Sequence, residues 1–185
     1  MSRKSKTDWY WACSRIVVKD GAKKLTIDAL CQNLGMTKGS FYHHFKGMAD
    51  FVEAFLVFFE QEGTLQIIEV VEQETTPQNK LRKLIELATE YPSELERGAR
   101  AWAHQDGRVS AVFERVDQQR LDYVTDLWRP LVADASTARV RVQMMYSILI
   151  GGEHILPTCA DMDLVYLYSP TIVITTFPFL CPVST

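Results

Sequence analysis

The chain of 185 residues is 47% hydrophobic and carries a formal net charge of −3 at pH 7, a composition that excludes a disordered, highly charged chain. The charge is uneven, because residues 1–46 hold nine Lys or Arg and three acids, a net +6, whereas the remaining residues hold eleven and twenty, a net −9. A basic head on an acidic body favours an anionic partner for the head alone, although a solvated charged face has the same composition.

The cysteines lie far apart in the sequence, without a histidine beside them at zinc-ligand spacing: Cys13, Cys31, Cys159 and Cys181. We therefore expect a reduced, cytoplasmic protein with no structural metal. No apolar run of signal-peptide length precedes Asp20, so export is not expected.

The head is predicted to contain three short helices. Apolar residues at helical spacing indicate a first helix from about Thr7 to Asp20, and a second helix that Thr26 caps and that runs to about Leu34. Gly35 ends the second helix, and Thr37 is the expected N-cap of the third. The third helix places two rings at i, i+4 spacing on one core-facing side, Phe41 and Phe45.

The body is predicted to be helical as well, with helices over about residues 48–74, 78–91, 93–105, 108–131 and 136–155. The fold class is therefore all-α, with a small N-terminal domain over residues 1–47 and a larger helical domain over residues 48–185. The uncharged segment 164–185 contains three prolines and is too interrupted to span a membrane; burial and a disordered tail both remain open.

The helix over about 136–155 is apolar around much of its circumference, which suits a subunit interface. We expect Met145 and Ile148 to fill the seam of a homodimer there, and Gly151 and Gly152 to allow close approach of the two subunits.

A helix-turn-helix motif is predicted from Thr26 to Phe45, in the sequence TIDALCQNLGMTKGSFYHHF. Such a motif lays one helix across the DNA backbone and places a second in the major groove, with a glycine at the turn between them. Gly35 supplies the turn, and Met36 is expected to fill the core beneath it. The outward face of the second helix then carries a donor-rich set: Lys38, Gly39, Ser40, Tyr42 and His43.

This stretch resembles the DNA-binding signature of the TetR family, with a Thr-led helix, a Gly turn and a Tyr-x-x-Phe ending. Looser similarity continues through RAWAHQD, ERVDQQRLDYV and GGEHILP, to about Pro157. The resemblance implies an all-helical homodimer, with a helix-turn-helix DNA-binding domain over residues 1–47 and an effector-binding and dimerisation domain over residues 48–185. It implies that the protein binds double-stranded operator DNA and releases it when an apolar small molecule enters the body. The sequence departs from the family at Met48, where a second lysine is usual.

By motif position, the resemblance implies that Thr26, Thr37, Tyr42 and Lys46 contact phosphates. It implies that Lys38, Gly39, Ser40 and His43 lie against base edges or backbone. The alternative for Tyr42 is a place in the core, but Phe41 and Phe45 already hold the inward positions. A metal site at His43 and His44 is not expected, because neighbouring helical residues diverge by about 100°.

The pocket candidates of the body are polar or amphipathic residues near its aromatic core: Trp102, His104, Arg120, Tyr123 and Tyr146. The effector, the operator sequence and the choice between repressor and activator are left open. No cofactor is expected, and no nucleophile elbow or phosphate-binding Gly loop indicates an enzyme. The competing interpretation is a helical adaptor protein without DNA binding.

Overall fold

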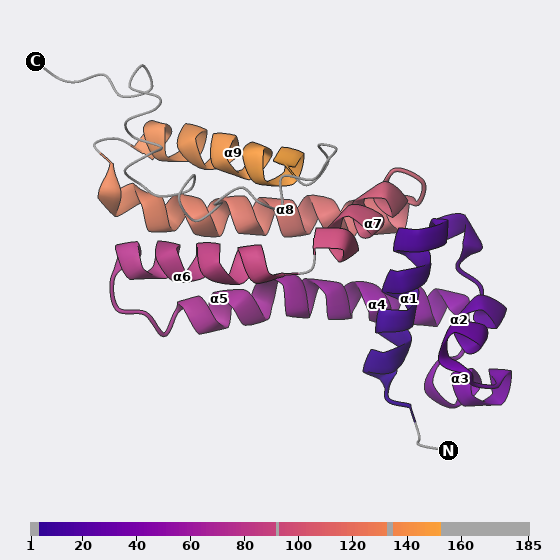
Figure 1. Cartoon of the computed structure of the whole chain (residues 1–185). Helices are drawn as coiled ribbons and strands as arrows, with labels where there is room; N and C mark the ends of the chain where they lie inside the picture. The colour runs from indigo at the N-terminus through magenta and orange to yellow at the C-terminus, as the bar shows by residue number, and fades with distance from the viewer. Residues whose placement is uncertain (1–3, 92, 133–134, 153–185) are drawn as a thin grey trace, which may run out of the picture. The chain divides into compact units, whose positions relative to one another are not determined.

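The computed structural model describes residues 4–91, 93–132 and 135–152 (Figure 1). Over these residues the chain forms α-helices joined by short turns and no strand, so the predicted all-α class is confirmed. The α-helices are α1 (Lys6–Asp20), α2 (Ile27–Leu34), α3 (Lys38–His44), α4 (Met48–Glu60), α5 (Gln66–Val71), α6 (Pro77–Glu90), α7 (Ser93–Ala103), α8 (Gly107–Trp128) and α9 (Ala135–Gly152). None of them is both long and apolar enough to cross a membrane.

The contacts divide the chain into two compact units. Unit 1 combines Met1–Gly63 with Pro92–Arg115, and unit 2 combines Thr64–Tyr91 with Val116–Thr185. Unit 1 therefore holds α7 and the first turns of α8 as well as the three helices of the head. The domain boundary predicted between residues 47 and 48 does not coincide with a boundary of these units, and it stays a prediction.

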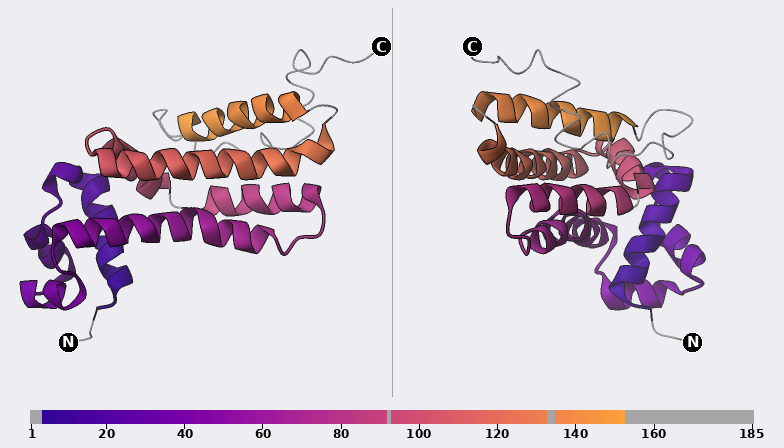
Figure 2. Two further views of the ribbon diagram at one scale, coloured as in Figure 1. Left: turned by 180° about the vertical axis from the view of Figure 1, so that it is seen from behind. Right: turned by 60° about the vertical axis from the view of Figure 1, so that its left-hand side comes forward.

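The core of unit 1 is built from aromatic rings that α1 brings onto α3, and both views of Figure 2 show α1 beside α2 and α3. Trp9 lies edge-on to Phe41 with ring centroids 5.5 Å apart, and Tyr10 lies 5.9 Å from Phe45. All four side chains are buried. The head is thus fixed by large rings, each removing considerable apolar area from water.

Helix α7 also packs on α1, at a point where only a glycine fits. A Cβ atom added to Gly98 would lie 2.8 Å from Val18 Cγ2 and 3.3 Å from the Val18 backbone nitrogen. Real Cβ atoms do not approach so closely, so the absence of a side chain at Gly98 sets the distance between these two helices.

The long helix predicted over about 48–74 is interrupted and ends earlier than expected. Helix α4 stops at Glu60, a π-helical segment covers Gln61–Leu65, and α5 ends at Val71. The π segment contains Gly63 and Thr64, which are weak helix formers, and the buried Thr64 side chain accepts a hydrogen bond from Arg120. The widened turn is therefore tied to a contact that lies 56 residues away in the sequence.

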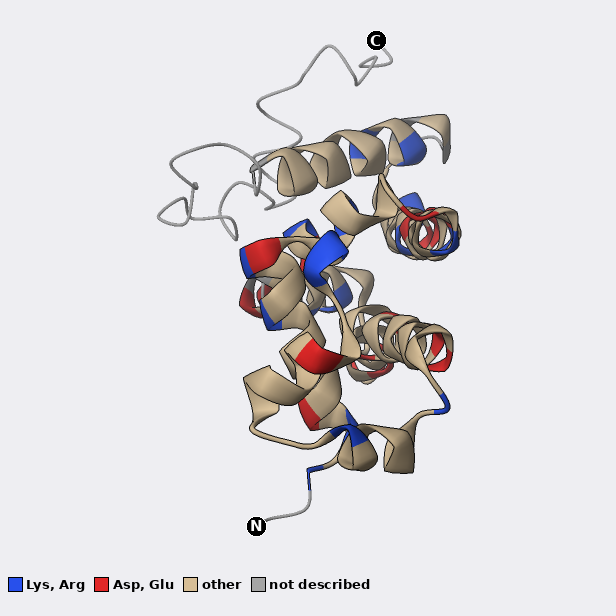
Figure 3. Cartoon of the chain, turned by 90° about the vertical axis from the view of Figure 1, so that its right-hand side faces the viewer, with Lys and Arg blue, Asp and Glu red and all other residues tan. Residues whose placement is uncertain are grey.

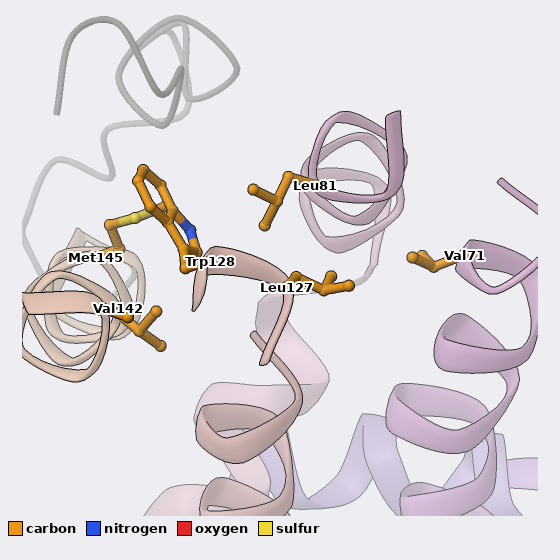
Figure 4. Close-up of a cluster of buried hydrophobic side chains, with 7 residues drawn as sticks. Val71, Leu81, Leu127, Trp128, Val142 and Met145 are labelled. Carbon is orange, nitrogen blue, oxygen red and sulfur yellow. The ribbon is translucent and has the colours of Figure 1, made fainter. Parts of the chain in front are cut away.

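The core of unit 2 joins α5, α6, α8 and α9 around a fully buried indole, Trp128 (Figure 4). Met145 of α9 points toward Trp128 and is only 8% exposed. The prediction that Met145 fills a seam between subunits is therefore wrong, because the side chain is used inside its own subunit. Ile148, by contrast, is 44% exposed.

Two predictions fall partly outside the described residues. The last helix is described only to Gly152, short of the predicted end near residue 155, and the segment 164–185 is not described. Cys13 and Cys31 are buried free thiols, whereas Cys159 and Cys181 lie outside the described residues.

Candidate nucleic-acid interface

Helices α2 and α3 form a helix-turn-helix whose ends are set by the residues that the sequence indicated. Thr26 Oγ1 accepts a hydrogen bond from the Ala29 amide at 3.1 Å, and Thr37 Oγ1 accepts one from the Ser40 amide at 3.3 Å. Gly35 closes α2 in the left-handed conformation, with φ 63° and ψ 36°, where an L side chain is strained. The two N-caps and the glycine together fix the turn between the helices.

The inner side of the motif is sealed and its outer side is open. Leu30 of α2 and Phe41 of α3 are fully buried, and Phe45 is 2% exposed. Met36, which was predicted to fill the core beneath the turn, is only half-buried. Amphipathic packing of this kind leaves the opposite face of α3 in solvent.

The predicted reading surface is that exposed face. Tyr42 is 55% exposed, so its predicted outward position is confirmed. Lys38, Gly39 and His43 are exposed, and Ser40 is half-buried beside Thr37. Internal packing does not account for the glycine, since a Cβ at Gly39 would meet only Thr37 Oγ1 at an ordinary 3.6 Å.

Three further phosphate-contact candidates are exposed as well: Thr26, Thr37 and Lys46. The Thr26 hydroxyl accepts from the backbone and has a hydrogen to donate, whereas the Thr37 hydroxyl also shares a hydrogen bond with Ser40 Oγ at 3.2 Å. The Lys46 amide donates to Asp50 Oδ2 at 2.8 Å, which joins the end of α3 to the first turn of α4. The motif thus brings all eight predicted DNA-binding residues into one continuous stretch of the head.

An acid in the motif was missed by the sequence analysis. Asp28, in the first turn of α2, accepts an ion pair from Lys38 at 2.8 Å between Oδ1 and Nζ. The hydrogen bond from Lys38 to Asp28, together with the acid's charge, raises the pKa of Lys38. An acid in the first turn of α2 and a lysine at the start of α3 were the features of the sequence that could have predicted this ion pair.

A second polar contact steadies the motif from α1. Arg15 donates to Asn33 Oδ1 from both Nε and Nη2, at 3.1 and 2.8 Å. Because Asn33 lies in the last turn of α2, this fork holds the end of α2 just before the Gly35 turn.

The five pocket candidates are divided between the two units. Trp102 and His104 lie in unit 1, where Trp102 is buried against Phe55 with ring centroids 6.0 Å apart and His104 is exposed. Trp102 also lines an open hollow of about 280 Å³, whose rim carries the ion pair between Asp106 and Arg108.

The remaining three candidates lie in unit 2, in two polar clusters. Arg120 donates to Thr64 Oγ1 at 3.0 Å and to Tyr146 Oη at 3.3 Å, and Tyr146 donates to Asp117 at 2.6 Å. This network, which includes the buried Thr64, touches the π segment.

The second cluster is centred on Glu72, which accepts from Tyr123 at 2.7 Å and forms an ion pair with Lys80. These two donors lower the pKa of Glu72, and burial together with the Glu72 charge raises the pKa of Tyr123. Across the described residues, no three His, Cys, Asp or Glu side chains gather where they could hold a metal ion.

The fold and the motif define a helix-turn-helix regulator that binds DNA. The family model of bacterial regulatory proteins, tetR family, matches residues 14–55, which span most of α1 and all of α2 and α3. Residues 14–55 thus match the DNA-binding region of that family, and the comparisons support a TetR-family regulator. The resemblance noted in the sequence is thereby confirmed, and the helical adaptor without DNA binding is not favoured.

Solved structures of other TetR-family regulators share the whole fold. A transcriptional regulator of the TetR/AcrR family is similar with a TM-score of 0.74 and 15% identity, covering 95% of this chain and 97% of its own. A TetR-family regulator from Streptomyces coelicolor has a TM-score of 0.67 and 18% identity, covering 95% and 89%. The fatty acid degradation regulator FadR from Bacillus halodurans has a TM-score of 0.68 and 14% identity, covering 94% and 96%.

These identities are low enough that the structures establish the shared fold alone. A comparison with curated proteins finds no match. The family and the structural neighbours are regulators rather than enzymes.

Proposed function

We propose that the protein is a transcriptional repressor that binds a pseudo-palindromic operator as a homodimer and leaves it when a small apolar molecule binds the body. The observation that carries the proposal is α3: its inner rings are buried, and its outer face presents lysine, glycine, tyrosine and histidine to solvent. A protein that uses chromosomal DNA in this way acts in the cytoplasm.

On the DNA, α3 enters the major groove and the flanking residues contact phosphates. Tyr42, Lys46 and the two capping threonines position the head, and Lys38, Ser40 and His43 face base edges. Gly39 supports this orientation. Its φ is not positive, and a Cβ there would make only an ordinary contact with Thr37 Oγ1, so a glycine in the first turn weakens α3 without any benefit inside the chain. Close approach of the α3 backbone to DNA explains the missing side chain.

The proposed dimer forms through the outer face of α9. Its inner face is occupied by Ala138, Val142 and Met145, whereas Val140 and Ile148 are 42% and 44% exposed. The only charged residues of α9 are basic, as its blue and tan ribbon shows (Figure 3). Paired α9 helices would bury these two exposed apolar positions. Nothing lies within 4 Å of a Cβ at Gly151, which leaves room for close approach.

The proposed effector site lies in unit 2, at the network of Arg120, Thr64 and Tyr146. Three observations support it: the network is part-buried, it supplies several polar groups at one point, and it touches a π-helical segment, a feature frequent at functional sites. Structural neighbours regulate fatty acid degradation and a multidrug efflux pump of Stenotrophomonas maltophilia, which supports an apolar effector. Helix α8 carries residues of both units, with Arg120 in its unit 2 part.

The test has two stages. A duplex is first selected from a random library by the wild-type protein, and its binding is measured against a scrambled duplex of the same composition. Ligands found by thermal-shift screening are then titrated by calorimetry with and without the selected duplex. An inducer must bind less tightly to the DNA complex by the same factor by which it weakens DNA binding, roughly 5- to 150-fold. Equal ligand affinities in the two titrations would refute effector release while leaving DNA binding intact.

A further inference from the structure

The ion pair between Asp28 and Lys38 places a negative charge on a surface that otherwise offers donors to an anion. Asp28 lies in the first turn of α2, and Lys38 is the first residue of α3. Their side chains are 74% and 60% exposed, and Oδ1 and Nζ lie 2.8 Å apart. The pair therefore spans the two helices of the motif on its open side.

Stability does not explain the pair. Exposed ion pairs contribute little to folding, because water screens the attraction and both side chains lose freedom. The orientation of α3 relative to α2 is already fixed by the Gly35 turn, the Thr37 N-cap and the buried side chains of Leu30 and Phe41. An acid in the first turn also favours the helix N-terminus, but that role does not need Lys38.

The chemistry of the pair points to DNA recognition. A lysine ammonium has three hydrogens, and when one is held by Asp28 two remain for acceptors. Guanine presents two neighbouring acceptors, O6 and N7, in the major groove. A free lysine is drawn to the nearest phosphate, whereas a lysine paired with a carboxylate carries little net charge toward the backbone.

We propose that Asp28 is a specificity-determining residue: it holds Lys38 so that the ammonium reads a guanine rather than a phosphate, and its own charge weakens binding to DNA of the wrong sequence. The inference rests on DNA binding by the α2–α3 motif and deepens that function. Asp28 need not touch the DNA, because it acts through the position and the net charge of Lys38.

The experiment compares Asp28→Asn with a matched control, Asp20→Asn, in the full-length protein. Asp20 is an exposed acid at the end of α1, so its replacement changes the net charge of the head equally without touching the motif. The probes are the duplex selected by the wild-type protein, single G·C to A·T variants of it, and a scrambled duplex. Fluorescence anisotropy at fixed salt gives the dissociation constant for each.

For Asp28→Asn we expect tighter binding to the scrambled duplex, by roughly 3-fold per head from the lost repulsion. We also expect the preference for one guanine of each half-site to fall by roughly 5-fold or more. Asp20→Asn should leave that preference unchanged. Asp28→Glu, which keeps the carboxylate, should retain most of it. On a Lys38→Ala background, Asp28→Asn should cause no further loss of guanine preference, since the residue acts through Lys38.

Two results would overturn the inference alone: equal effects of Asp28→Asn and Asp20→Asn on every duplex, or an undiminished guanine preference in Asp28→Asn. Circular dichroism and thermal melting check that each variant is folded. If Asp28→Asn does not fold, the guanine preference of Asp28→Glu tests the inference instead. A wild-type protein that prefers no duplex would instead overturn DNA recognition itself, and the inference with it.

Discussion

Replacing Gly98 by alanine tests whether close packing of α7 on α1 holds unit 1 together. The new methyl group would lie 2.8 Å from Val18 Cγ2, 3.3 Å from the Val18 nitrogen and 3.4 Å from Val17 Cγ1. Valine is stiff at χ1 and the nitrogen belongs to the backbone, so the overlap cannot be relieved by a side-chain rotation alone. The two helices must move apart.

The expected size follows from two opposing terms. Overpacking in a tight contact costs about 1 to 3 kcal/mol, and alanine in place of a mid-helix glycine returns about 0.5 to 1 kcal/mol. We therefore expect Gly98→Ala to lower the free energy of unfolding by about 1 kcal/mol, or up to about 2 kcal/mol. Gly107→Ala is the matched control, because nothing lies within 4 Å of a Cβ there. It should be neutral or slightly stabilising.

Urea unfolding followed by circular dichroism measures both variants. The Val18→Ala and Gly98→Ala double variant should lose less stability than the two single losses combined, by about 0.5 kcal/mol or more, because removing Val18 Cγ2 makes room for the methyl group. The prediction would be refuted if Gly98→Ala lowers the free energy of unfolding no more than Gly107→Ala does, or if the losses from Val18→Ala and Gly98→Ala are additive. Close packing of α7 on α1 would then not require a glycine at position 98.

Three further predictions concern DNA contact, dimerisation and pH. Tyr42→Phe removes one hydroxyl and should weaken binding to the selected and scrambled duplexes alike, by roughly 3- to 10-fold. His43→Ala should also change the base preference. Unchanged DNA affinity in both variants would show that the exposed face of α3 is not the reading surface. Ile148→Arg should give a monomer by light scattering, because the charge would be buried in the interface without a partner. The control Val57→Arg, at a 62% exposed position of α4, should leave a dimer. If both variants are dimers, the interface lies elsewhere. Lys80 and Tyr123 lower the pKa of Glu72 in the folded protein, so the unfolded state binds more protons as the pH falls through the ordinary Glu value of 4.5. The free energy of unfolding should therefore fall as the pH drops from 5 to 3, and Glu72→Gln should flatten this fall. A pH profile of the urea midpoint that Glu72→Gln leaves unchanged would argue against the Glu72 cluster.

Local signals made the head predictable from the sequence. Thr26, Thr37 and Gly35 act through their own backbone or that of residues three or four positions away, and each lies where the sequence placed it. The inward rings Phe41 and Phe45 follow from helical spacing in the same way. Short-range chemistry therefore located both the motif and its exposed face.

Contacts between distant segments were not predictable. The π segment receives a hydrogen bond from the distant Arg120, and α7 packs on α1 where Gly98 meets Val18. Helix α9 is apolar on most sides, so its sequence did not show that Met145 faces Trp128 while another side stays exposed. Pairing of Asp28 with Lys38 likewise needed the geometry of the turn.

The central claim, sequence-specific DNA binding by α3, is tested most directly by measuring the affinity of the wild-type protein for the selected and scrambled duplexes across a series of salt concentrations. With about 6 to 10 phosphate contacts in a dimer, the logarithm of the binding constant should fall against the logarithm of salt with a slope of about −5 to −9. The selected duplex should bind at least about 10³-fold more tightly than the scrambled one. Equal affinity for the two duplexes, or binding that does not change with salt, would contradict the account.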